Sequence, residues 1–279
     1  MQDFHIIKYP YIPCPLKKTI EVTALHTAFV HRMEPDYSSE SESHDFWEII
    51  VVLDGEVSVV TGEHVFLLSK NSMLIHPPLE FHRHFNHTSQ KNTYAVISFS
   101  AELLPVAKNS IYTLSSSDVS EFRAIIRLIR EQYKIDKICV LEKKDTARPS
   151  IDQEVKSRLE YFLSMALYSK ITPYQITSKE YQRIVSYLRE NLHKNLSIPI
   201  IAQELEMSTA NLKRVFSLFS GMGIMKYFNQ LKFQKATSLL EEGHSVREVS
   251  EMLAFTSQSV FSTAFKKATG TPPSKHRQH

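Results

Sequence analysis

Apolar residues recur with helical spacing in two similar stretches near the carboxyl end of the chain. The first covers 198–216 and the second 246–267, and each predicts a short helix, a tight turn and a second helix. A small residue, Ala202 or Ser250, stands where the two helices of each unit must cross closely. The hydroxyl residues expected to cap the second helices are Ser208 or Thr209, and Thr256 or Ser257. Both patterns are typical of helix-turn-helix units, whose second helix can enter a DNA major groove.

The outward positions of the two second helices carry side chains that can contact DNA. Arg can donate two hydrogen bonds to guanine, Gln and Asn can pair with adenine, and hydroxyls can reach base edges or phosphates. One polar helix face alone would indicate only a solvated surface, but two such units in tandem favour DNA recognition. The predicted DNA-contacting residues are Thr209, Ala210, Asn211, Lys213, Arg214, Ser257, Gln258, Ser259, Ser262, Thr263 and Lys266.

A long amphipathic stretch between the two units predicts a connecting helix over 223–242, with Gly243 just beyond its end. Another helix is predicted over 179–193, before the first unit. A stiff connector would keep the two second helices at a separation suited to successive major grooves, about 34 Å apart.

The first hundred residues show short segments rich in β-branched and aromatic residues, separated by turn signals such as Asp54-Gly55 and Pro77-Pro78. This spacing favours a small antiparallel barrel or jelly roll. The acidic, serine-rich stretch 34–43 predicts an exposed loop. Strands are predicted over 47–53, 57–61, 64–69, 73–76 and 94–100.

Two helical stripes follow the strands, over 117–129 and 152–167, the first with Ser117 or Asp118 as its cap. They can pack on the barrel, on each other or on a second copy of the chain, and we favour a homodimer through 117–170. The expected class is α+β with two domains. The expected division is a sensing and dimerisation domain over 1–172, its barrel within 1–110, a linker over 173–179, and a DNA-binding domain over 180–279.

Charge and composition narrow the possible functions. Residues 174–279 carry 14 Lys and Arg against 8 Glu, whereas residues 1–173 carry 19 against 22 acidic residues, so only the carboxyl-terminal part is basic. Cys14 and Cys139 lie far apart and form no CxxC pair, which argues against a zinc finger, a redox motif or a disulfide scaffold. Neither has a nearby Cys or His at metal spacing, which disfavours an alkyl-transfer cysteine. No nucleophile triad order, P-loop or dinucleotide motif is present, so we expect no enzyme and no cofactor. The absence of a membrane-length apolar run and of a leader pattern predicts a cytoplasmic protein.

An ordered set of residues in the carboxyl-terminal part, over about 180–277, carries a family resemblance. These residues include Ile201, Ala202, Leu205, Ser208, Leu212, Phe216, Gly221, Tyr227, Leu231, Ala236, Leu239, Leu240, Val249, Phe255, Phe261, Phe265, Lys266, Lys267, Gly270 and Pro272. With them the chain resembles the AraC/XylS family of bacterial transcription factors. The resemblance implies a helical domain that binds double-stranded promoter DNA through two recognition helices, with RNA polymerase as a possible partner. Glu206 and Ala254 stand where the family usually has Gly, at a cost of about 1 kcal/mol each if the turns are left-handed. Lys232 replaces a usual Arg, and Thr263 stands where relatives often have Arg.

Two segments of the amino-terminal part, His44-Asp-Phe-Trp-Glu48 and Pro77-Pro-Leu-Glu-Phe-His82, carry a weaker resemblance. They resemble the cupin-like sensor domains of the same family. The resemblance implies a small-molecule effector, such as a sugar or related metabolite, bound inside the barrel. A metal-binding cupin would use His44, Glu48 and His82, with Glu42 and Leu79 in place of a usual His and Gly. Metal-binding cupins are a minority among such sensors, so we expect no metal. The alternative is a metal-dependent cupin domain with catalytic or metal-sensing activity.

Alternation along the segment 44–53 places Glu48 and Trp47 on opposite faces, and the sequence leaves open which face lines the barrel. His76, His87 and His244 are expected in loops or at the surface. The candidate ligand-binding residues are His31, His44, Phe46, Trp47, Glu48, His82 and His84.

Overall fold

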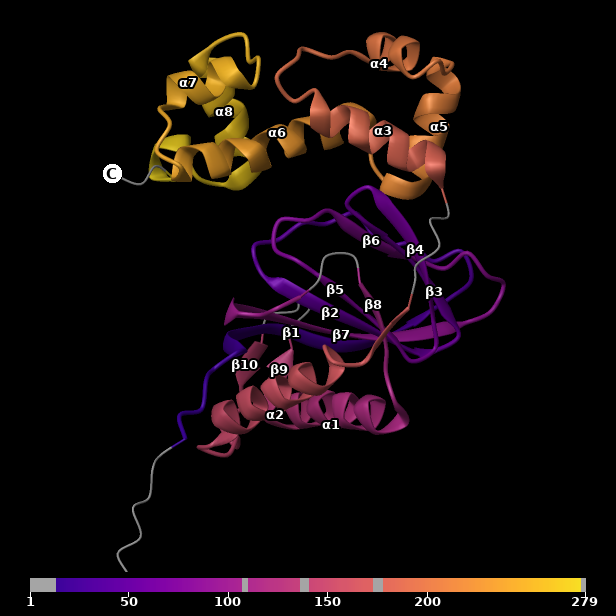
Figure 1. The fold of residues 1–279 in the computed structure, drawn as a ribbon, viewed down its shortest axis with the longest axis vertical. Coiled ribbons are helices and arrows are strands. Elements are labelled where there is room, and N and C mark those ends of the chain that lie inside the picture. Colours follow the sequence, from indigo (N-terminus) through magenta and orange to yellow (C-terminus); the bar gives the residue numbers. More distant parts are fainter. Residues whose placement is uncertain (1–13, 107–109, 136–140, 173–177, 277–279) are drawn as a thin grey trace, which may run out of the picture.

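The computed structural model describes residues 14–106, 110–135, 141–172 and 178–276, with strands dominating the first part and helices the last (Figure 1). We call 14–172 the strand-rich part and 178–276 the helical part. The strand-rich part contains β1 (Glu21–Met33), β2 (Trp47–Asp54), β3 (Glu56–Thr61), β4 (His64–Ser69), β5 (Ser72–His76), β6 (His82–Phe85), β7 (Asn92–Leu103), β8 (Ile111–Thr113), α1 (Ser116–Gln132), β9 (Tyr133–Ile135), β10 (Leu141–Lys143), α2 (Ile151–Ala166) and β11 (Lys170–Thr172).

The strands pair in antiparallel fashion in separate sheets. One sheet has the order β1-β7-β2-β5-β8-β11, a second has the order β4-β3-β6, and β10 pairs with β9. The two larger sheets face each other across one apolar cluster, to which Ile50 contributes from the first and Val59 from the second. The expected α+β class is confirmed, but within the described ranges the sheets do not close into a barrel.

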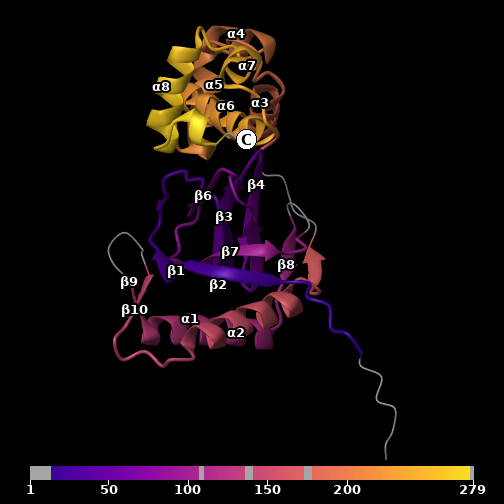
Figure 2. The same cartoon turned by 90° about the vertical axis from the view of Figure 1, so that its left-hand side faces the viewer.

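Strand β2 is buried on both faces, which explains its almost uninterrupted apolar sequence. Glu48, Ile50 and Val52 face the space between the two sheets. Ile49 and Val51 face the opposite way and pack with α1 and α2, which cover the outer face of the larger sheet (Figure 2). The structure therefore answers the question that alternation left open: the Glu48 face is the interior one.

Helices α1 and α2 bury their apolar stripes against each other and against the sheet, in a cluster that includes Phe122 and Phe162. These stripes are core, so a dimer through 117–170 would have to use the outer faces of the helices instead. The cap of α1 is Ser115, not Ser117 or Asp118 as expected, and Asp118 completes the capping box from the N3 position.

The helical part contains the two expected helix-turn-helix units, joined by one long helix. Its elements are α3 (Lys179–Glu190), α4 (Ile198–Glu204), α5 (Thr209–Ser220), α6 (Ile224–Glu241), α7 (Val246–Met252), α8 (Gln258–Thr269) and a short 3-10 helix (Pro273–Lys275). Ser208 and Ser257 cap α5 and α8 with their side chains. Glu206 and Ala254, in the two turns, have φ angles of 55° and 52°, so both adopt the left-handed conformation that favours Gly.

The buried side chain of Lys232, on α6, forms a hydrogen bond with the second helix-turn-helix unit. The Lys232 ammonium donates to the carbonyl oxygens of Lys194 and Leu253 at 2.9 and 2.7 Å, and it lies 4.9 Å from the centre of the Phe228 ring. Burial lowers the pKa of Lys232 to about 8. The carbonyl of Leu253 precedes the left-handed Ala254, so this contact supports the second turn directly.

The lowered pKa of Lys232 predicts a pH-dependent contribution to stability. Between about pH 8 and 10 the folded chain loses this proton while the unfolded chain keeps it, so the contribution increases with pH. The free energy of unfolding of the wild type should therefore rise relative to Lys232→Met by up to about 1 kcal/mol per pH unit, after allowing for solvent screening. Chemical denaturation across this range measures it. The exposed control Lys235→Met should show no such trend, and parallel curves for wild type and Lys232→Met would contradict the prediction.

Candidate functional site

A cavity of about 570 Å³ opens between the two sheets, a size suited to a small molecule. We call it the cup. Aromatic and aliphatic side chains form one part of its wall, and histidines, carboxylates and hydroxyls form the other. The lining residues are Leu25, His26, Thr27, Phe29, His31, Tyr37, Ser39, Glu42, His44, Phe46, Glu48, His84, Tyr94, Ser98 and Leu141.

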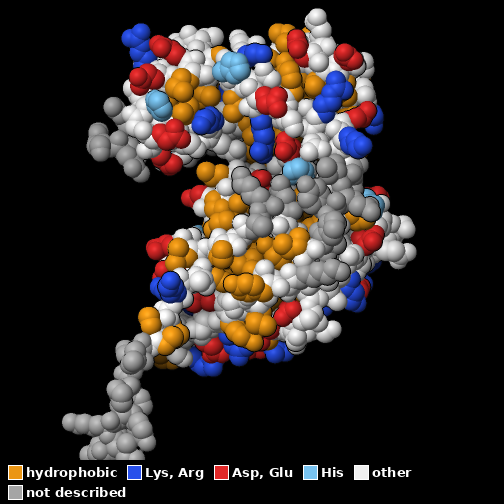
Figure 3. Space-filling model, in the orientation of Figure 1, with side chains coloured by type: hydrophobic (Ala, Val, Ile, Leu, Met, Phe, Trp, Pro, Cys, Tyr) orange, Lys and Arg blue, Asp and Glu red, His pale blue; other side chains and the backbone are white. Residues whose placement is uncertain are grey.

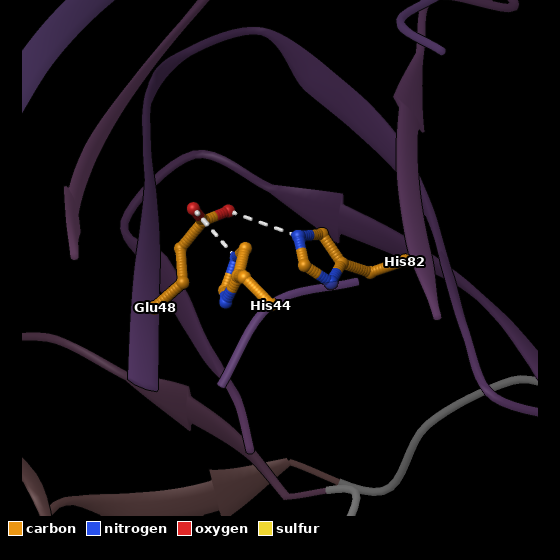
Figure 4. A group of neighbouring side chains, drawn as sticks. All are labelled: His44, Glu48 and His82. Atoms are coloured by element: carbon orange, nitrogen blue, oxygen red, sulfur yellow. Dashed lines mark ion pairs between the residues drawn. The ribbon is translucent and has the colours of Figure 1, made fainter. Parts of the chain in front are cut away.

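The polar end of the cup is centred on the buried carboxylate of Glu48, which points between His44 and His82 (Figure 4). The Nε2 atom of His44 lies 3.5 Å from Oε2 of Glu48, and Nε2 of His82 lies 3.5 Å from Oε1. Ser98 donates a hydrogen bond to Oε2 at 2.9 Å. Each carboxylate oxygen therefore faces one imidazole, at a distance longer than a good hydrogen bond.

The main chain orients both imidazoles. Nδ1 of His44 lies 3.0 Å from the carbonyl oxygen of Phe46, and Nδ1 of His82 lies 3.0 Å from that of Glu80. A carbonyl only accepts, so each Nδ1 carries the proton and donates. The Nε2 atoms of His44 and His82 point toward Glu48 without a hydrogen-bond partner among the described residues.

Two further histidines lie beside this group. His76 and His84 are buried, and their Nε2 atoms are 3.1 Å apart, so one donates to the other. Nδ1 of His76 lies 3.3 Å from Oγ1 of Thr61. The expectation that His76 is a loop or surface residue is wrong: it pairs with Glu48 across β5 and β2, and this register directs it inward.

Burial and neighbouring charges set the ionisation of the cluster. Burial alone would raise the pKa of Glu48, but His44 and His82 together lower it well below its ordinary value. Burial opposes the charge on His82, yet Glu42 and Glu48 raise its pKa to about 10. Burial lowers the pKa of His84 to about 4. At neutral pH, without a bound ion, an anionic Glu48 therefore faces a protonated His82, with a neutral His84 alongside.

The structure brings together most of the residues predicted for the ligand site. His31, His44, Phe46, Glu48 and His84 line the cup, and His82 contacts Glu48 from the fully buried side. Trp47 is not brought to the site, since it packs with the helix-covered cluster on the other face of β2.

Sequence reasoning missed several residues that line the cup. The stretch 34–43 is mostly exposed, as expected, but Tyr37, Ser39 and Glu42 from it line the cup. Residue 42 exchanges two backbone hydrogen bonds of 3.0 Å with His82, which hold this segment beside β6. Leu25 and Thr27 of β1 were also missed, and their alternation with the predicted His31 was the signal available for them.

The cluster fits a divalent transition-metal ion. The donor atoms of His44, Glu48 and His82 lie within 4.8 Å of one another, and imidazole with carboxylate is a ligand set for Zn, Fe, Mn or Ni. The carbonyls that hold both Nδ1 atoms are the outer contacts typical of metal-binding histidines. When bound, an ion with three protein ligands would offer an open position to an oxygen of a small molecule.

The predicted DNA-contacting side chains lie on the outer faces of α5 and α8. Of these, Asn211 and Ser262 are half-buried and the others exposed. The Arg214 guanidinium donates to Oδ1 of Asn211 at 2.8 Å, which holds two potential base-reading groups side by side.

Two known protein families match separate stretches of the chain. A helix-turn-helix domain family matches residues 201–279, and the AraC-like ligand binding domain family matches residues 25–162. The chain belongs to the AraC family of transcriptional regulators. It is a DNA-binding regulator with a ligand-binding amino-terminal domain. None of the described helices is long and apolar enough to cross a lipid bilayer.

Relatives of this chain include other transcription regulators. An uncharacterized HTH-type transcriptional regulator, YfiF from Bacillus subtilis, is 21% identical over 88% of this chain and 81% of its own. The probable transcription factor PqrA from Proteus vulgaris is 32% identical over 34% of this chain and 81% of its own. Among solved structures, ToxT from Vibrio cholerae matches 93% of this chain and 97% of its own, at 14% identity and a TM-score of 0.37.

Replacing Glu48 with Gln should lower the pKa of His82. In chelator-treated protein the amide cannot stabilise the imidazolium as the carboxylate does, so the pKa should fall from about 10 by at least about one unit. NMR titration of the imidazole resonances measures it. Glu40→Gln, in the exposed part of the neighbouring segment, is the matched control and should leave the titration unchanged. A His82 that still titrates near 10 in Glu48→Gln would contradict this electrostatic account.

Proposed function

We propose that α5 and α8 read promoter DNA together, under the control of a small molecule bound in the cup. The observation that supports this most is that the exposed, polar faces of α5 and α8 belong to two units joined by the single helix α6. The proposed division is a sensing domain over 1–172, a linker over 173–179 and a DNA-binding domain over 180–279. Residues 173–177 of the linker lie outside the described residues.

The cup chemistry supports a polar effector such as a sugar or related metabolite. Glu42, Ser98 and Tyr94 offer hydrogen-bonding groups, and Phe29 offers an apolar surface. The Nε2 atom of His31 and the Oγ1 atom of Thr27 are buried and have no hydrogen-bond partner among the described residues. Such atoms are costly unless a ligand or water satisfies them.

We further propose a homodimer and a cytoplasmic location. Tyr161, Met165 and Tyr168 lie exposed on and just after α2, and they are the apolar groups that a second copy would cover. We also propose that the protein contacts RNA polymerase when it is bound at a promoter.

The DNA-binding assignment is tested by selecting duplexes from a random library with the full chain. Arg214→Ala and Gln258→Ala should each weaken binding to the enriched duplex by about 5- to 150-fold while leaving binding to random duplex nearly unchanged, because each loses a base contact. Fluorescence anisotropy at fixed salt measures both affinities. Arg123→Ala, on the exposed face of α1, is the control. Unchanged preference in both variants would contradict the assignment of these faces.

A divalent metal ion is a second candidate for the cup ligand, alone or together with an organic molecule. The two Nε2 atoms directed at Glu48 favour it, because a metal ion can take the place of the proton that His82 otherwise holds and bind both imidazoles and the carboxylate. The comparisons provide no support for catalysis at such a site, and we propose none.

Metal binding is tested by adding Zn²⁺ to chelator-treated full-length protein in a calorimetric titration. About one ion per chain is expected, and Glu48→Gln should weaken its affinity by at least about tenfold, since one of three ligands is lost. His31→Gln changes a histidine that lines the cup outside the triad and should not alter the affinity. Equal Zn²⁺ binding by wild type and Glu48→Gln, or no binding, would contradict the candidate.

A further inference from the structure

Strand β6 presents alternate residues to the cup and to the helical part. His82 and His84 point inward to the polar cluster around Glu48. Arg83 and Phe85 point outward, where Phe85 packs with the apolar cluster of α3, α5 and α6. Because neighbouring residues of a strand move together, any displacement of the two histidines also displaces Arg83.

Arg83 holds the carboxyl end of the first recognition helix. Its Nη1 donates to the carbonyl oxygens of Leu218 and Phe219 in the last turn of α5, at 3.0 and 3.1 Å. These carbonyls belong to the helix end that lacks intrahelical donors and carries the negative end of the dipole. Gly221 follows, and a Cβ there would come within 2.8 Å of the guanidinium, so the contact is closely packed.

The segment 38–44 runs beside β6 and has the same two-sided arrangement. It pairs with β6 at Glu42 and His82, and the Arg83 Nε donates to the Ser39 carbonyl at 3.0 Å. Glu42 and His44 face the cup. Ser43, which lies between Glu42 and His44, accepts a 3.0 Å hydrogen bond from Gln234 of α6. Ser41, which precedes Glu42, donates to the Ser220 carbonyl at 2.5 Å.

The two helix-turn-helix units differ in how they contact the strand-rich part. The apolar cluster of α3, α5 and the start of α6 continues into Val60, Val65 and Phe81 of the strand-rich part. The second unit packs in a cluster of its own on the far half of α6. In Figure 3 a hollow separates this end from the strands. A shift at β6 would therefore reach the first recognition helix directly, and the second only through α6 and Leu192, which packs against both clusters.

We propose that β6 and the segment 38–44 couple the cup to DNA binding, with Arg83 as the positioning residue that links the cluster to α5. The inference rests on the proposed function and adds the route of its regulation. A ligand at Glu48 meets His44, His82 and Glu42, which all lie on these two segments, so it can favour one placement of them over another. A preference of this kind is what linkage between two sites requires.

The coupling is tested by a double-mutant cycle on the full chain. Glu48→Gln alters the cup, Arg83→Met removes the contact to α5, and the two are combined. Hydrogen–deuterium exchange at the amides of 217–222 is one readout, and affinity for the enriched duplex is the other. With Arg83 present, Glu48→Gln should change both readouts, each by about fivefold or more. With Arg83→Met present, the same cup change should have almost no effect.

Two further variants keep the cycle interpretable. Arg123→Met removes an arginine of the same size from α1, on the opposite side of the sheets, and should leave the response to Glu48→Gln intact. Arg83→Lys keeps the charge but not the forked donors, so an intermediate response is expected and serves if Arg83→Met does not fold.

The outcomes separate the coupling from the proposed function. Effects of Glu48→Gln that are the same with and without Arg83, or no effect of Glu48→Gln on either readout, would overturn the coupling. Arg83-dependent changes in exchange at 217–222 would support it even if no duplex is enriched, and in that case the DNA-reading proposal alone would fail.

Discussion

The buried carboxylate of Glu48 is the constraint around which the strand-rich part is organised. A charge that is removed from water must be paired or hydrogen-bonded, and here imidazoles and one hydroxyl supply the partners. The carbonyls of Phe46 and Glu80 hold those imidazoles in place, so the ends of β2 and β6 and the segment before β2 are positioned relative to one charge. The same segments form the boundary with the helical part, which places the polar cluster and the interface a few residues apart.

The helical part depends on a different and more local constraint, the geometry of two tight turns. Glu206 and Ala254 accept a strained left-handed conformation because the helices on both sides are capped and packed. Lys232 adds a buried contact to the carbonyl before the second turn. Each recognition helix is thereby held by its own unit, whereas the relation between the units is set by α6 and by the contacts of the first unit with β6.

Much of this arrangement could be predicted, because the signals were periodic and local. The two helix-turn-helix units, the connecting helix and the central strands follow from spacing of apolar residues alone. His76 was misplaced, although the strand predicted over 73–76 includes it, because the direction of its side chain depends on pairing with β2. The stripes of α1 and α2 were assigned to a dimer, because periodicity shows that a face is covered but not what covers it.

By itself the sequence determined the kinds of element, their order and which side chains face outward on the two second helices, since helix and strand periods, caps and turn residues act over a few positions. Only the tertiary structure decided which face of β2 is interior, which histidines surround Glu48, and that Arg83 reaches the end of α5. Those relations join residues far apart in the chain, such as Arg83 and Leu218, and they depend on strand register and on packing between the two parts. The apolar pattern of β2 does not specify its facing direction, because both of its faces are buried and the pattern does not distinguish them.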